Sequence, residues 1–147
     1  MPARKSSPKE LLGFSVFQRY RSPLKKVWDA ATQTKHLNGF FTDGAKGNIT
    51  PKMDPVTWRW KNYGSAAIDV TACDPGKSFE FLWGTPMGYQ TKVRFEFSRE
   101  KGKTVVRIQE FGWKPAHIDD AFDHCQGWSE YLYGLKAYVQ HGIDLRK

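Results

Sequence analysis

The chain has few cysteines, which limits the covalent and metal chemistry open to it. Its only two, Cys73 and Cys125, form no CxxC pair and have no flanking histidine pattern. This spacing favours two free, partly buried thiols in a reducing compartment over a disulfide or a metal site. The sequence therefore predicts no metal and no cofactor.

Long apolar runs are also missing. No stretch approaches the roughly 20 apolar residues of a membrane-spanning helix. Residues 1–10 carry charges but no apolar segment of the kind found in a secretory signal. We expect a cytoplasmic protein without a membrane span.

Sequence signatures of catalysis are absent as well. The chain contains no HExxH, no glycine-rich phosphate loop and no paired-histidine spacing. No Ser/His/Asp or Cys/His arrangement typical of nucleophilic catalysis can be recognised either. Whether the protein is an enzyme is left open by these absences.

Positive charge is abundant but unevenly placed. Of the net charge of +8, most falls in residues 1–26, which hold seven Lys and Arg against one acid, Glu10. A nucleic-acid-binding module would instead spread basic residues along a face with exposed aromatics between them. The distribution indicates a basic tail over residues 1–12 and makes nucleic-acid binding the least favoured function. We predict that this tail is disordered and that residues 13–147 form a single domain.

Aromatic residues are plentiful: six Trp, ten Phe and six Tyr make up 15% of the chain. Large flat side chains suit a β-sheet. Alternating or strand-like segments separated by turn residues predict strands at 14–20, 56–60, 66–72, 77–83, 91–97 and 104–111. The short connections between them predict antiparallel pairing.

Helical patterns frame these strands. Ser22 and Pro23 are typical of a helix start, with Ser22 as the N-cap, and a second short turn is expected at residues 34–38. A long helix is predicted from Ile118 to Gly142. Its apolar stripe, spaced at three and four residues, comprises Phe122, Cys125, Trp128, Leu132, Leu135 and Val139.

The resulting order is strand, two helices, six strands and a long helix, with one strand expected within residues 40–54. It resembles the helix-grip fold of the SRPBCC or START-like superfamily, which includes the birch-pollen allergen. This is an α+β fold in which a curved antiparallel sheet wraps around a long C-terminal helix.

Three motifs are similar to the branch named for the activator of heat-shock protein 90 ATPase, the activator-homologue family. The first is SPLKKVWDAA at residues 22–31, and the second is ACDPG at 72–76 followed by FEFLW at 79–83. The third is the Gly127-Trp128 pair with Leu132, Leu135, Lys136, Tyr138 and Gly142 after it. The likeness covers about residues 14–142.

The resemblance implies a hydrophobic cavity between the sheet and the long helix. Strand parity and the helix stripe then suggest the residues that line it. The candidates are Trp58, Trp60, Ile68, Phe81, Trp83, Phe95, Ile108, Glu110, Phe122, Cys125 and Trp128. Each could equally belong to an ordinary aromatic core.

Glu110 stands out because it shares its parity with Val106 and Ile108 and should face the interior. A buried, unpaired carboxylate has a raised pKa, so Glu110→Gln is expected to be neutral or stabilising. Glu110 could anchor a ligand's polar group or act as a general base; alternatively it reaches solvent or pairs with a nearby base. His124 is interpreted as a rim or surface residue rather than a catalytic base.

Three functions follow from this. The favoured one is binding of an apolar small molecule, with Glu110 or Tyr89 making the polar contact to it. The resemblance also admits an enzyme of the polyketide-cyclase type, which would need acid and base groups converging in the cavity. A third possibility is a co-chaperone-like partner of heat-shock protein 90, which would bind through its surface. The sequence predicts neither the ligand nor the oligomeric state.

Overall fold

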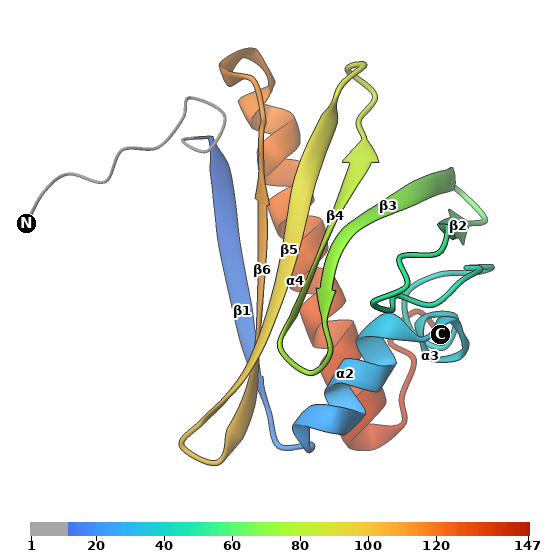
Figure 1. The fold of residues 1–147 in the computed structure, drawn as a ribbon, viewed down its shortest axis with the longest axis vertical. Helices are drawn as coiled ribbons and strands as arrows, with labels where there is room; N and C mark the ends of the chain where they lie inside the picture. Colours follow the sequence, from blue (N-terminus) through green and yellow to red (C-terminus); the bar gives the residue numbers. More distant parts are fainter. Residues whose placement is uncertain (1–11) are drawn as a thin grey trace, which may run out of the picture.

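The computed structural model describes residues 12–147, so the predicted tail lies almost wholly outside the described residues. The structure contains one six-stranded antiparallel sheet in the order β1-β6-β5-β4-β3-β2. The strands are β1 (Gly13–Tyr20), β2 (Val56–Trp60), β3 (Gly64–Asp74), β4 (Ser78–Gly84), β5 (Gln90–Glu100) and β6 (Lys103–Phe111). Figure 1 shows the sheet with the long helix α4 (Ile118–His141) across one of its faces.

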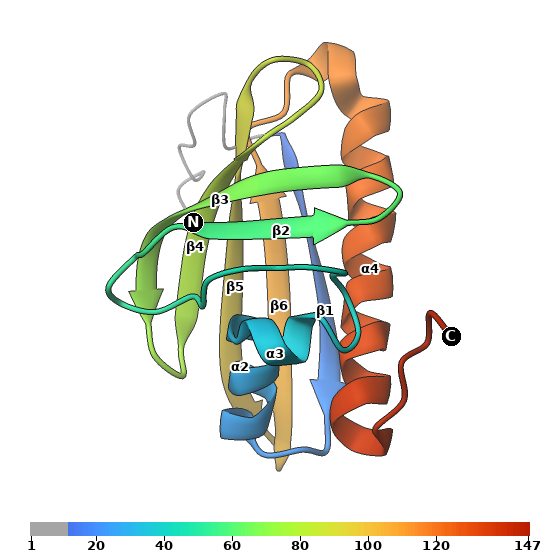
Figure 2. The same cartoon turned by 90° about the vertical axis from the view of Figure 1, so that its right-hand side faces the viewer.

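The sheet curves so strongly that its two ends lie on different sides of the interior. β1, β6 and β5 run roughly along α4, whereas the β2–β3 hairpin crosses this direction (Figure 2). The two shorter helices, α2 (Leu24–Thr32) and α3 (Thr34–Leu37), lie at one end of the interior. The α+β helix-grip fold predicted from the sequence is confirmed.

Residues 40–54 do not form the expected strand. Five strands, not six, follow the two short helices, and this segment makes a single isolated bridge, Lys46 to Thr57. Gly44, Gly47 and Pro51 interrupt it. Gly47 has φ +86°, and a Cβ there would clash with the carbonyl oxygen of Pro55, so the backbone turns where a strand would have to continue.

Ser22 does not cap α2 as predicted. The N-cap position is Pro23, and no side chain bonds the free N–H groups there. The Ser22 hydroxyl instead donates to the carbonyl oxygen of Val139 on α4, 3.3 Å away. The Ser22 hydroxyl therefore makes a tertiary hydrogen bond to α4 instead of a local one to the backbone at the start of α2.

The long helix ends where the sequence indicates. Gly142 adopts a left-handed conformation, φ 66°, and its N–H bonds the carbonyl oxygen of Tyr138. This single bond from the first residue after the helix is that of an αL C-cap motif, and the next amide, that of Ile143, bonds the carbonyl oxygen of Ala137.

The predicted apolar stripe of α4 is wrong at its first member. Phe122 is 64% exposed, while Ala121 is buried. The helix turns about 100° per residue, so a stripe that buries Trp128 and Leu135 passes over position 121 rather than 122. The remaining buried residues of α4 are Tyr131, Leu132, Gly134 and Val139.

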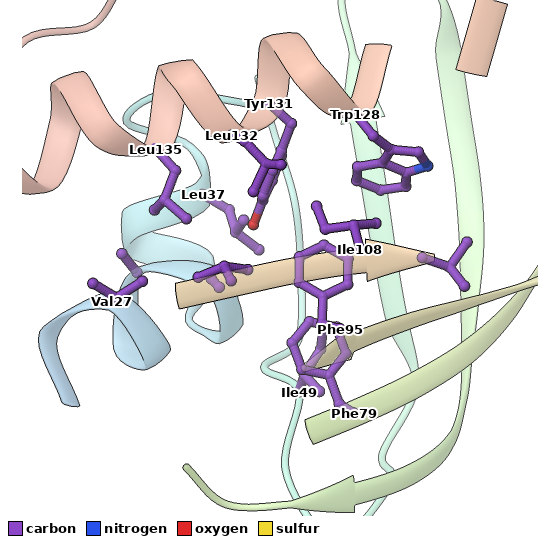
Figure 3. Packing of buried hydrophobic residues seen from close by; sticks show 14 of the residues in the cluster. Val27, Leu37, Ile49, Phe79, Phe95, Ile108, Trp128, Tyr131, Leu132 and Leu135 are labelled. Carbon is purple, nitrogen blue, oxygen red and sulfur yellow. The ribbon is translucent and has the colours of Figure 1, made fainter. Parts of the chain in front are cut away.

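Large rings and branched side chains fill the space between sheet and helix (Figure 3). The Phe95 ring of β5 contacts Trp128 and Tyr131 of α4 edge to face, with centroids 5.5 Å apart in both pairs. Phe79 stacks on Phe95 at 4.4 Å. The middle of the interior is thus a packed aromatic core.

Tyr20 ties the end of β1 to the middle of α4. Its side chain is fully buried, and its hydroxyl donates to the carbonyl oxygen of Leu132 at 2.8 Å. Tyr20→Phe should lower the free energy of unfolding by about 1 kcal/mol, the usual contribution of one such hydrogen bond. Urea denaturation measures this loss, and Tyr133→Phe, at an exposed position of α4, is the matched control. Equal stability of the two variants would contradict the contribution of the Tyr20 hydroxyl.

Candidate functional site: an aromatic groove over a buried carboxylate

The sheet register gathers polar and aromatic side chains at one end of the interior. Trp83 of β4 pairs directly with Thr91 of β5. Two residues along β5, Val93 pairs with Glu110 of β6. Alternate residues of a strand share a face, so Thr91, Val93 and Glu110 point to the same side of the sheet.

The long helix supplies the other half of the cluster. His124 and Trp128 lie four residues apart on α4, a spacing that places both on one helix face. Trp128 is buried and His124 is half-buried. Both side chains reach Glu110, which itself is fully buried.

Four donors surround the carboxylate of Glu110. Its Oε1 accepts from the indole N–H of Trp128 at 2.8 Å and lies 3.1 Å from His124 Nδ1. Its Oε2 accepts from the Thr91 hydroxyl at 2.6 Å and the Trp83 indole N–H at 3.0 Å. A carboxylate offers about four lone-pair positions, so these partners occupy it completely.

This network reverses the expected pKa shift of Glu110. Burial alone would raise the pKa, but the hydrogen bond and charge of His124, with the hydrogen bonds from Thr91 and Trp83, outweigh burial. The pKa of Glu110 is therefore lowered from its ordinary value. The sequence-based expectation of an unpaired carboxylate with a raised pKa is wrong, because residues from three other elements converge on it.

An open groove of about 790 Å³ lies directly over this cluster. It runs between the β2–β3 hairpin, the end of β4 and the N-terminal half of α4. Its lining comprises Phe41, Trp60, Tyr63, Ser65, Ala66, Trp83, Gly84, Pro86, Asp123, His124, Gly127, Trp128 and Glu130. Five of these residues are Phe, Tyr or Trp, and two, Asp123 and Glu130, carry carboxylates.

The predicted lining residues divide into four groups. Trp60, Trp83 and Trp128 line the groove, and Glu110 lies buried behind the last two. Five others are enclosed in the packed core: Trp58, Ile68, Phe81, Phe95 and Ile108. Phe122 is exposed to solvent, and Cys125 is half-buried outside the groove lining.

Tyr89, the other suggested source of polarity, is engaged elsewhere. Its hydroxyl lies 2.8 Å from His117 Nδ1 and accepts the N–H of Lys114 at 3.2 Å. Its ring stacks on that of His117. It is not among the groove-lining residues.

Sequence reasoning missed several groove residues, both between the regular elements and within them. Phe41 lies in the segment whose path was not predictable, and Tyr63 in a turn. Gly127 and Gly84 carry no side chain, so hydrophobic patterning has nothing to detect there. His124 had one usable signal: its spacing of four from Trp128, which indicates a shared face.

Within residues 12–147, no three His, Cys, Asp or Glu side chains gather in a way that could hold a metal ion. In the same range, no helix is both long and apolar enough to cross a bilayer.

Residues 21–140 match the family described as "Activator of Hsp90 ATPase homolog 1-like protein". No curated protein sequence matches the chain.

Solved structures show the same fold at low identity. SSP2350 from Staphylococcus saprophyticus is 19% identical, with TM-score 0.80 over 92% of this chain and 96% of its own. The Aha1 dimer from Colwellia psychrerythraea is 21% identical, with TM-score 0.77 over 89% and 98%. DynU16, a protein in the dynemicin biosynthetic locus, is 17% identical, with TM-score 0.76 over 88% of this chain and 48% of its own.

Proposed function

The chain belongs to the Activator of Hsp90 ATPase homolog 1-like family, and we propose that it binds a small, flat, largely aromatic molecule in the groove beside α4. The observation that carries this proposal is the groove itself. Its volume of about 790 Å³ falls within the range of about 300–1,000 Å³ typical of small-molecule sites. Its lining combines five Phe, Tyr and Trp rings with a few polar groups, as is usual for such sites.

The arrangement of the rings suits a planar guest. Phe41 meets Trp60 edge to face at 5.3 Å, and Trp83 lies 5.5 Å from Trp128. Trp60 and Trp83 are only half-buried, so part of their apolar surface contacts water in the absence of a ligand. A ligand that covers this surface gains about 25 cal/mol of binding free energy per Å² of apolar area removed from water. The ring of Tyr63, which is 88% exposed, would also contact the bound ligand.

Two glycines keep the groove open. An added Cβ at Gly127 or at Gly84 would meet no atom within 4 Å. Gly127 lies in the middle of α4, where glycine costs about 1 kcal/mol relative to alanine. The absence of a side chain there leaves the space that we assign to the ligand.

Gly127→Leu should therefore fill the groove without harming the fold. We expect the affinity for a neutral aromatic probe, N-phenyl-1-naphthylamine, to fall at least about tenfold, which corresponds to about 1.4 kcal/mol. The melting temperature should stay the same or rise, because leucine favours the helix. Probe fluorescence and quenching of the tryptophans measure binding.

Gln126→Leu is the matched control, since position 126 is exposed on the same helix but is not part of the groove lining. Its affinity should equal that of the wild type. If Gly127→Leu binds the probe as tightly as Gln126→Leu does, the groove is not the binding site.

A further inference from the structure

The carboxylate of Glu110 is unavailable to a ligand, although it lies next to the groove. Both oxygens are occupied by Trp128, Thr91 and Trp83, and its side chain is fully buried. The one partner of Glu110 that is neither a tryptophan nor buried is His124. Glu110 can therefore influence a ligand in the groove through His124.

The hydrogen bond to Glu110 determines which nitrogen of His124 carries the proton. An ionised carboxylate only accepts, so His124 Nδ1, at 3.1 Å, must donate to it. In the neutral ring the other nitrogen, Nε2, then carries a lone pair. Among residues 12–147, no side chain or backbone group bonds Nε2, and His124 is part of the groove lining.

Two indole rings hold the imidazole in this orientation. Trp113 lies edge to face with His124 at 4.7 Å and 80°, and Trp83 does so at 5.6 Å and 77°. The side chain of His124 is nevertheless 27% exposed. The ring is thus fixed by its neighbours while part of the side chain stays accessible.

We propose that His124 Nε2 is a general base that removes a proton from an aromatic compound bound in the groove, and that Glu110 is its positioning residue. This inference rests on the proposed function of the groove. The substrate class is a flat aromatic or conjugated molecule with an acidic C–H or a phenolic or enolic O–H. Glu110 holds the tautomer and, once the proton has moved, faces the imidazolium with its negative charge.

The probe reaction is the ring opening of 5-nitrobenzisoxazole, a neutral, flat compound. The Nε2 lone pair takes the proton from C3, and the C–H electron pair forms the third bond of a nitrile. The N–O bond breaks, and its electrons remain on oxygen as a coloured phenolate. The imidazolium then releases its proton to water. No oxidant or other reactant is needed.

Comparison of the wild type with His124→Gln tests the role of the base. We expect kcat for the probe to fall at least about tenfold in His124→Gln, with KM changed less than about twofold, because general bases contribute about 10²–10⁴-fold. His141→Gln, at the exposed end of α4, should react like the wild type. Equal kcat in His124→Gln and wild type would overturn the proposal.

A second measurement needs no substrate. Nitrogen NMR shifts of the His124 ring should show a protonated Nδ1 and an unprotonated Nε2 in the neutral form. A proton on Nε2 would overturn the proposal even if the groove binds ligands. If the probe fails to bind the wild type, the proposed function fails for such compounds, and the tautomer still decides the role of His124. A bound probe that the wild type does not convert counts against the general base.

Discussion

Replacing Trp128 with alanine should lower the free energy of unfolding by about 3–5 kcal/mol, among the largest losses of any single substitution in this protein. Trp128 is 3% exposed and contacts Phe95 of the sheet and Tyr131 of its own helix. Alanine would leave a cavity between sheet and helix. It would also remove the indole N–H that donates to Glu110 at 2.8 Å.

Trp128→Phe separates the two losses. Phenylalanine keeps much of the ring volume but cannot donate, so we expect a smaller loss of about 1–3 kcal/mol, because Oε1 of Glu110 loses one of its two donors. Thermal unfolding should place the melting temperatures in the order wild type, Trp128→Phe, Trp128→Ala. A melting temperature of Trp128→Ala within a degree or two of the wild type would contradict the burial of this ring.

The second large effect is expected for Glu110→Gln, which should lower the free energy of unfolding by about 3–5 kcal/mol. The glutamine amide has the size of the carboxylate, but its NH₂ group is a donor. It would face donors from Trp83, Thr91, Trp128 or His124 and leave at least one of them without an acceptor. Glu100→Gln, at the exposed end of β5, should change stability by less than about 0.5 kcal/mol. Urea denaturation at neutral pH compares the two variants.

The acid dependence of stability provides an independent check on Glu110. Because its pKa is lowered in the folded state, its contribution is present above its ordinary pKa and is lost as pH falls through the folded value. The stability difference between wild type and Glu110→Gln should therefore shrink on acidification below about pH 4.3. A difference that widens there would mean that the folded pKa is raised and the hydrogen-bond network is not formed.

Local patterns were sufficient for most of the elements. Alternation predicted β2 at its observed bounds and β6 to within one residue, and Gly142 marked the end of α4. These features depend on neighbours within a few positions along the chain. Where a residue made a tertiary contact instead, as the hydroxyl of Ser22 does with Val139, local reasoning chose the wrong partner.

The sequence by itself determined the curved antiparallel sheet, the long helix, the family and the inward direction of Glu110. Strand parity, helical spacing and turn residues act over short distances and can be read in order. Only the tertiary structure decided what Glu110 meets there. Its donors come from β4, β5 and α4, separated from it by 14 to 27 residues, and together they turn a costly buried charge into a satisfied one. The groove likewise depends on the position of the β2–β3 hairpin beside Gly127 of α4. No pattern along a single strand encodes how far apart these two elements lie.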